Sequence, residues 1–150
     1  MKSTVTFEPA SERDADELAS LRVEAMRESL ERIDRFNPER ARSRFLSSFL
    51  PHHTRHILLG GKRVGFVVVR PEADHLLLDH LYIRPNSQRQ GVGSAVLSEV
   101  FAQADRENLV LKVGALKESD SNRFYQRHGF TLVEQAEFDN YYVRRTTSAH

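Results

Sequence analysis

The stretch that decides the fold lies at residues 81–94 and reads LYIRPNSQRQGVGS. A strand pattern passes through a polar loop directly into helical spacing. Gly91 and Gly93 stand at the first turn of that helix, where missing Cβ atoms let main-chain N–H groups approach an anion. The positive end of the helix favours the anion's charge, so the stretch predicts an anion site. The alternative is a tight turn that needs glycine only for close packing.

The flanking segments make this stretch part of a β-α-β unit. Residues 75–83 have the pattern of a strand, apolar residues keep helical spacing from Gln88 to Ala104, and residues 109–113 predict a buried strand. Such a crossover makes the two strands parallel and places the helix start beside the C-terminal end of the first strand. Ligands favour that position in α/β proteins.

The other segments predict further strands and helices. Upstream we expect a strand at 5–7, a helix from a Ser11–Asp14 capping box to about Ile33, a helix capped by Asn37 and stopped by Pro51, and a hairpin of 57–59 and 64–69. Downstream we expect a helix from Ser119 or Asp120 to Gly129, then strands at 131–134 and 140–145. The fold class is therefore α/β, a single domain over residues 1–150.

Composition excludes several classes of function. The chain has 150 residues, 22 basic and 21 acidic, and this balance disfavours nucleic-acid binding by bulk charge. Without cysteine there is no disulfide, thiolate metal site or cysteine nucleophile. We find no signal peptide and no apolar run of membrane-spanning length, so we expect a cytoplasmic protein without a membrane partner.

Two better-known phosphate loops do not fit. The Gly91-x-Gly93 pattern has Val96 where the dinucleotide fingerprint has its third glycine. The run Gly60-Gly61-Lys62 lacks the spacing and the hydroxyl residue of a Walker loop, and it fits a hairpin turn. Nucleotide hydrolysis is disfavoured.

Two motifs carry a resemblance to a known family. Gln88-x-x-Gly91-x-Gly93, after a strand that ends in Leu-Tyr-Ile-Arg-Pro, resembles the acetyl-CoA motif of GNAT-type (GCN5-related) N-acetyltransferases. Tyr125-x-x-x-Gly129-Phe130 resembles a later signature of the same family. The order of the elements also matches over nearly the whole chain.

The resemblance implies a mixed, mostly antiparallel seven-stranded sheet with about four helices, splayed at the cofactor cleft. It implies acetyl-CoA as the acetyl donor, with no metal, and an amine acceptor as the second partner. Main-chain amides between Arg89 and Ser94 would hold the CoA pyrophosphate, and the main chain of two strand residues would contact pantetheine. The implied cofactor-binding residues are Leu81, Ile83, Gln88, Arg89, Gln90, Gly91, Val92, Gly93 and Ser94.

Acetyl transfer to an amine needs a neutral nucleophile, an oxyanion donor and a proton for the leaving thiolate. A phenol ordinarily stays protonated at neutral pH, and the resemblance places Tyr125 beside the CoA thiol, so Tyr125 is the candidate acid. The alternative is a core aromatic residue. By resemblance, the oxyanion donor is a main-chain N–H near Leu81 or Tyr82.

The base is the least constrained group. Asp79 shares the Leu81 face of its strand by two-residue alternation, whereas His80 points the other way unless a bulge reverses the order. Asp79 is therefore the candidate base. A strand-end carboxylate paired with Arg or Lys and a water relay are the alternatives.

The chain departs from the family pattern at Glu118, because many members have asparagine seven residues before the tyrosine. Asn122 lies one helical turn before Tyr125 and is the candidate substitute as a cofactor contact. A role at the helix start is the alternative.

Other constellations are weaker. The cluster His52, His53 and His56 contains no carboxylate and does not indicate zinc. Serines near His128 have no strained elbow or matching acid, which disfavours a covalent serine mechanism. Tyr141 and Tyr142 alternate in facing, and one of them would line the acceptor pocket or make a homodimer contact.

The sequence therefore predicts an acetyl-CoA-dependent N-acetyltransferase, an acyltransferase enzyme that acts on a primary amine of a small molecule or peptide. The amine attacks the thioester directly. The alternative is a noncatalytic acyl-CoA-binding or sensing domain that keeps the loop without turnover.

Overall fold

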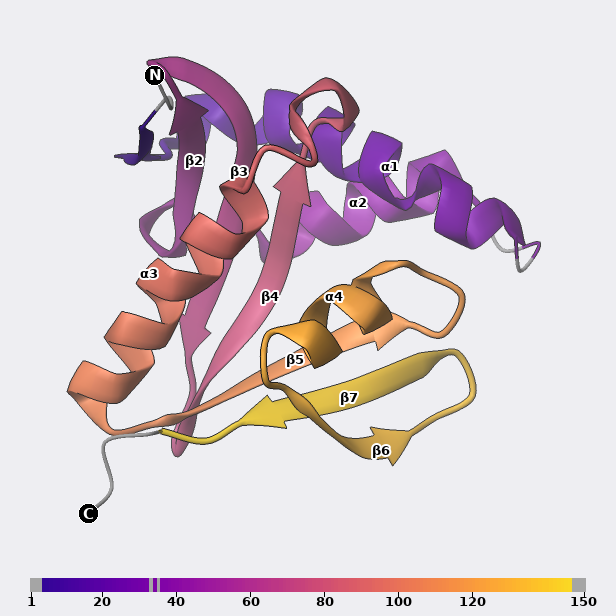
Figure 1. Cartoon of the computed structure of the whole chain (residues 1–150). Helices are drawn as coiled ribbons and strands as arrows, with labels where there is room; N and C mark the ends of the chain where they lie inside the picture. The colour runs from indigo at the N-terminus through magenta and orange to yellow at the C-terminus, as the bar shows by residue number, and fades with distance from the viewer. Residues whose placement is uncertain (1–3, 33, 35, 147–150) are drawn as a thin grey trace. The chain divides into compact units, whose positions relative to one another are not determined.

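The computed structural model describes residues 4–32, 34 and 36–146 (Figure 1). The strands are β1 (Val5–Pro9), β2 (Thr54–Leu59), β3 (Lys62–Pro71), β4 (His75–Ile83), β5 (Val110–Leu116), β6 (Thr131–Gln135) and β7 (Asp139–Arg144). The α-helices are α1 (Ala15–Arg32), α2 (Pro38–Ser48), α3 (Val92–Glu107) and α4 (Ser121–Arg127). Three 3-10 turns, η1 (Glu12–Asp14), η2 (Pro51–His53) and η3 (Pro85–Ser87), join them.

The seven strands are hydrogen-bonded in the order β1-β2-β3-β4-β5-β7-β6, and the sheet does not close. β4 and β5 pair in parallel, residues 75–78 with 110–113, while β1–β2, β2–β3, β5–β7 and β6–β7 pair antiparallel. The mixed, mostly antiparallel α/β fold with four α-helices is confirmed. The splay at a cofactor cleft stays a prediction.

The chain forms two compact units. Unit 1 takes in the described residues up to Val68 together with His80–Gly93. Its core joins α1, α2, β3 and the end of β4 through the buried residues Leu18, Ala19, Leu21, Phe45, Phe66, Val68 and Tyr82. At Gly65 a Cβ would lie 1.9 Å from the main-chain oxygen of Tyr82, so only glycine allows this close approach of the two main chains.

Unit 2 takes in Val69–Asp79 and the described residues from Ser94 onward. Parallel pairing sets Leu76 beside Leu111 and Leu78 beside Val113, and all four side chains are buried. The apolar face of α3 is buried too, through Val96, Leu97, Val100 and Ala104. Asp105 in the last turn of α3 forms an ion pair with Arg144 of β7, in which Nη1 of Arg144 lies 3.0 Å from Oδ1 of Asp105.

Most local signals for the element ends are confirmed. Asn37 caps α2 by accepting from the N–H of Arg40, and Gly60, Gly61 and Gly129 all adopt positive φ. The capping-box carboxylate of Asp14 accepts from the N–H of Ser11 at 2.9 Å, although a 3-10 turn precedes α1. The predicted helix end at Ile33 lies outside the described residues.

One helix boundary was predicted wrongly. Helical spacing predicted a start at Gln88, whereas α3 starts at Val92. Arg89 and Gly91 have φ of 66° and 77°, a left-handed conformation that cannot continue a right-handed helix. The strands β2, β3 and β5 also extend beyond their predicted ends. None of the described helices has the length and apolar character needed to cross a membrane.

A hydrogen bond between His56 and Asp14 fixes the start of α1 in unit 1. His56 of β2 is 1% exposed, and its Nε2 lies 2.9 Å from Oδ2 of Asp14. The hydrogen bonds from His56 and from the N–H of Ser11 hold the pKa of Asp14 below its ordinary value. Asp14 therefore stabilises the fold in its charged form.

Replacing Asp14 by asparagine should lower the free energy of unfolding at pH 7 by about 1–2 kcal/mol, because the charge-assisted bonds are lost. The depressed pKa in the fold means that this stability is present above the ordinary carboxylate pKa. This stability is lost as the pH falls through the pKa of Asp14 in the folded state. The variant should therefore lose less stability than the wild type on acidification. Urea unfolding at several pH values measures both effects.

The matched control is Asp16→Asn, which removes an exposed carboxylate in the first turn of α1 from its surface pair with Arg42. That variant should stay within about 0.5 kcal/mol of the wild type and keep its pH dependence. Equal effects of the two substitutions would contradict the role of the Asp14–His56 pair.

Candidate functional site

The loop that follows β4 in unit 1 is braced by its own side chains. The N–H of Arg84 donates to the main-chain oxygen of Val64 at 2.7 Å, which anchors the strand end. Nε2 of Gln88 donates to the oxygen of Ile83 at 2.9 Å, and Nε2 of Gln90 donates to the oxygen of Asn86 at 3.4 Å. The two glutamines therefore hold the shape of the loop, in addition to the donor role expected for them.

After this brace the main chain enters the first turn of α3, which begins at Val92. The N–H groups of a first helical turn have no acceptor within their own helix. Arg89 and Gly91 both adopt positive φ just before α3 begins. Consecutive N–H groups in alternating left- and right-handed conformations form an anion-binding concavity, and the helix start adds its positive dipole end.

The glycine at position 91 is explained by its backbone conformation. A Cβ built at Gly91 would meet no atom within 4 Å, so the protein does not need glycine there for close packing. What favours glycine is its φ of +77°. The anion site stays a prediction.

The two candidate bases lie in different surroundings. Nη1 of Arg70 donates to Oδ2 of Asp79 at 3.2 Å within unit 2, which is the ion pair considered as the alternative to a base. In unit 1 the ring of His80 packs against Phe45 and Phe66, with centroids 5.4 and 6.2 Å away. The expected alternation along β4 thus holds, and the base role of Asp79 stays a prediction.

Tyr125 lies in an aromatic cluster of unit 2. Its side chain is 6% exposed, and its ring contacts Phe130, Phe124 and Tyr142 with centroid distances of 5.2, 5.5 and 6.3 Å. The core-aromatic alternative is thus part of what the structure shows. A fixed ring with a hydroxyl at its tip is also what a positioned proton donor needs, so the catalytic role stays a prediction.

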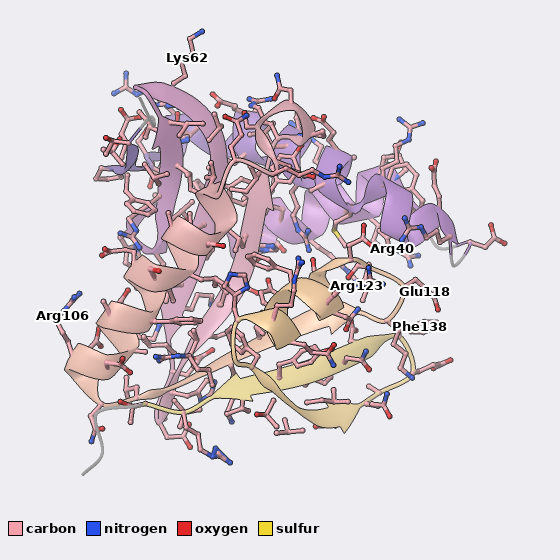
Figure 2. The ribbon with its side chains drawn as sticks, viewed as in Figure 1. Arg40, Lys62, Arg106, Glu118, Arg123 and Phe138 are labelled. Carbon is pink, nitrogen blue, oxygen red and sulfur yellow. The ribbon has the colours of Figure 1, made fainter. Side chains whose placement is uncertain are left out.

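Asn122 makes its hydrogen bonds within unit 2. Its Nδ2 donates to the oxygen of Leu116 at 2.7 Å, and its Oδ1 accepts from Tyr142 and Asn140. These bonds agree with the alternative role at the helix start, and the cofactor role stays a prediction. Figure 2 shows Glu118, the residue at the family's asparagine position, in the turn between β5 and α4, where its side chain is exposed.

The histidine cluster of the sequence separates in the structure. The rings of His52 and His53 pack against each other at a tilt, with centroids 4.0 Å apart, whereas His56 pairs with Asp14. Among the residues that the structure describes, no group of three histidine or acidic side chains is arranged to hold a metal ion.

Sequence reasoning missed two features because their partners are distant in the chain. Oγ of Ser94 lies 2.8 Å from Nε2 of His128, in unit 2. In unit 1, burial and the charge of Glu24 raise the pKa of Tyr82 to about 12. No local sequence pattern predicts either feature.

The neighbouring tyrosines of β7 face opposite ways, as alternation predicted. Tyr142 is 1% exposed in the core, whereas Tyr141 is 39% exposed. The ring of Tyr141 covers Gly114, where a Cβ would lie 3.0 Å from its Cε1. Of these two tyrosines, only Tyr141 is therefore exposed enough for the predicted role in acceptor binding or dimer contact.

Comparison with known proteins agrees with this geometry. A family model described as the acetyltransferase (GNAT) domain matches residues 52–132. The GCN5-like protein acetyltransferase Rv2170 of Mycobacterium tuberculosis is 30% identical over 84 residues, which make up 53% of this chain and 41% of that protein. The matched part of the chain thus spans less than half the length of this relative.

Solved structures share the fold over nearly the whole chain. An acetyltransferase from Thermus thermophilus superposes with a TM-score of 0.74 at 23% identity and covers 97% of this chain and 99% of its own. The PaiA N-acetyltransferase from Thermoplasma acidophilum, solved with coenzyme A, gives 0.72 at 16% identity over 95% and 99%. With the family match over more than half of the sequence, the chain belongs to the GNAT acetyltransferase family.

Proposed function

We propose that residues 1–150 form one acetyl-CoA-dependent N-acetyltransferase domain, which moves an acetyl group to a primary amine of a small molecule or peptide. The observation that carries the proposal is the left-handed turn at Arg89 and Gly91 directly before α3, whose first N–H groups have no acceptor within the helix. The complex of the PaiA relative with coenzyme A supports the same ligand class.

The loop residues fit the diphosphate of CoA. The N–H groups of the first turn of α3 supply donors, the open space beside Gly91 gives access, and the exposed Arg89 adds a positive charge. Val92, Gly93 and Ser94 lie in this first turn. Side-chain identity matters little for such contacts, except where φ is positive.

Leu81 and Ile83 of β4 would bind the pantetheine arm through main-chain groups, in the manner of an added strand. The oxygen of Ile83 already accepts from Gln88, and a carbonyl oxygen has a second lone pair for a further donor. Acetyl-CoA supplies the activated acetyl group as a thioester. The chain's own residues then bind it, orient it and manage two protons.

Tyr125 would give its phenol proton to the departing thiolate, and the surrounding rings would hold that phenol in place. Asp79 would take the proton of the acceptor ammonium, and its pair with Arg70 would have to open or be shared while it does so. A water relay performs the same step without Asp79. The amine then attacks the thioester directly, without an acyl-enzyme intermediate.

An acceptor screen tests the proposal as a whole. Purified protein is mixed with acetyl-CoA and a panel of primary amines and peptides, and free thiol is measured. Acceptor-dependent release of thiol supports the transferase. Thermal stabilisation by acetyl-CoA without any acceptor-dependent release would support the noncatalytic binding domain instead.

The location is a further part of the proposal. Absence of cysteine fits a reducing compartment, so we place the protein in the cytoplasm. Fractionation of the native cells measures this directly, and a secreted pool would contradict it.

Gly91→Val should weaken CoA binding at least about tenfold, because a β-branched side chain both strains the positive φ and covers the exposed N–H groups. Titration calorimetry with CoA measures the dissociation constant. Gly61→Val is the matched control, since Gly61 has φ of +84° and equally open space in the β2–β3 turn. Both variants should lose similar stability, but only Gly91→Val should lose affinity for CoA. If the two variants bind CoA equally well, the assignment of the loop as the CoA site is wrong.

Tyr125→Phe should lower kcat about 100-fold while the dissociation constant of CoA stays within about twofold, because only the proton donor is removed. Steady-state kinetics and calorimetry on the same preparation separate the two effects. Wild-type turnover in this variant would refute the acid role, whatever its thermal stability.

Asp79→Asn should lower kcat/KM about 100-fold and abolish the limb on which activity rises with pH, because amide cannot accept the proton. The control is Asp105→Asn, which removes another ion-paired carboxylate of unit 2. The control should keep the shape of the pH profile. An unaltered profile in the Asp79 variant would point to the water relay.

A further inference from the structure

The helix that carries Tyr125 is too short to hold its own position. α4 has seven residues, about two turns, and helices of this length are marginal in water without tertiary contacts. Resting on the proposed role of Tyr125, we infer that two side-chain clamps, centred on Asn122 and His128, position its hydroxyl for proton transfer. Asn122 and His128 are positioning residues, because neither is required to touch a substrate.

The first clamp holds the start of α4. Nδ2 of Asn122 donates to the main-chain oxygens of Leu116, Ser119 and Lys117 at 2.7, 2.9 and 3.2 Å, and so fixes the turn between β5 and α4. Oδ1 of Asn122 accepts from Nδ2 of Asn140 at 2.9 Å and from the hydroxyl of Tyr142 at 2.8 Å.

These bonds use the full capacity of the amide. A side-chain amide has two N–H donors and one oxygen with two lone pairs, and Asn122 meets three acceptors and two donors. A contact with CoA would have to break one of them. The clamp therefore explains Asn122 without a cofactor.

The clamp reaches Tyr125 through Tyr142. The hydroxyl of Tyr142 is tied to Asn122, and its buried ring lies 6.3 Å from the ring of Tyr125. Phe130 closes the cluster, with its ring 5.2 Å from Tyr125 and its N–H donating to the oxygen of Tyr125 at 3.1 Å. A shift of Tyr142 would move the surface on which the phenol ring of Tyr125 rests.

The second clamp holds the end of α4. Nδ1 of His128 lies 2.8 Å from the main-chain oxygen of Phe124, which can only accept, so Nδ1 carries a proton. In the neutral ring Nε2 is then an acceptor, and the hydroxyl of Ser94 donates to it at 2.8 Å. The ring of His128 also packs against the ring of Phe124 at a tilt, with centroids 4.5 Å apart. The residues that follow Tyr125 are thus tied to the first turn of α3.

Proton transfer to sulfur demands this precision, since a misplacement of about 1 Å costs on the order of 100-fold in rate. Three variants loosen the clamps to different degrees. Asn122→Ala removes the whole first clamp, and Tyr142→Phe removes one hydroxyl and keeps the ring. His128→Asn keeps a donor for Phe124 but is too short for Ser94. Each should lower kcat about 5- to 30-fold and leave the dissociation constant of CoA within about twofold.

A double-mutant cycle with Tyr125→Phe separates positioning from a general structural role. If the clamps act through the phenol, Asn122→Ala and His128→Asn should lower kcat no further once the phenol is gone. Asp105→Asn is the structural control in the same unit. The factor by which it lowers kcat should be the same in the wild-type and Tyr125→Phe backgrounds. Kinetics and calorimetry on purified full-length variants supply every corner of the cycle.

Three results would overturn the inference. The first is wild-type kcat in all three clamp variants, and the second is an undiminished loss in the Tyr125→Phe background. The third is a weakened CoA affinity for Asn122→Ala at normal kcat, which would restore its cofactor role. Failure of the proposed function is seen separately, because Tyr125→Phe alone would then turn over like the wild type. If Asn122→Ala does not fold, Tyr142→Phe and His128→Asn decide the question.

Discussion

The constraint on which the chain's chemistry depends is the direction of a few main-chain N–H groups. The N–H groups of the first turn of α3 have no acceptor within the helix, and Arg89 and Gly91 turn the chain left-handed just before that turn begins. An anion satisfies N–H groups at a helix start. Gln88 braces this geometry by donating to the oxygen of Ile83. In the proposed function, recognition of the diphosphate therefore depends on backbone conformation, and side chains act as braces.

Local signals were enough to predict most of the fold. One or two residues were enough to predict the helix start at Asn37 and Pro38 and the turn at Gly60 and Gly61. Two-residue alternation along β4 predicted that Asp79 and His80 face opposite sides of the strand. The start of α3 was missed because the residues directly before it, Gln88 to Gly91, are polar or glycine and give the apolar spacing no boundary. Only the positive φ values, which spacing does not encode, move that start to Val92.

The candidate site was predictable where it consists of main chain and less so where it depends on distant partners. Asn122 is bound by Asn140 and Tyr142, which lie 18 and 20 residues away, and Ser94 meets His128 across 34 residues. Such pairs follow from the register of strands and the packing of helices. Asp79 is a similar case. The sequence indicated a base or a carboxylate paired with some Arg or Lys, and only the structure identified Arg70 as its partner.

The two parts of the proposed chemistry therefore depend on sequence in different ways. An N–H group is supplied by every residue except proline, so the diphosphate loop tolerates change wherever φ is negative and constrains it at Gly91. A phenol proton comes from Tyr125 alone, and its place is set by contacts with α4, β7 and the first turn of α3. In the proposed chemistry, turnover therefore depends on particular side chains that a single substitution can remove, whereas CoA binding depends mainly on backbone conformation.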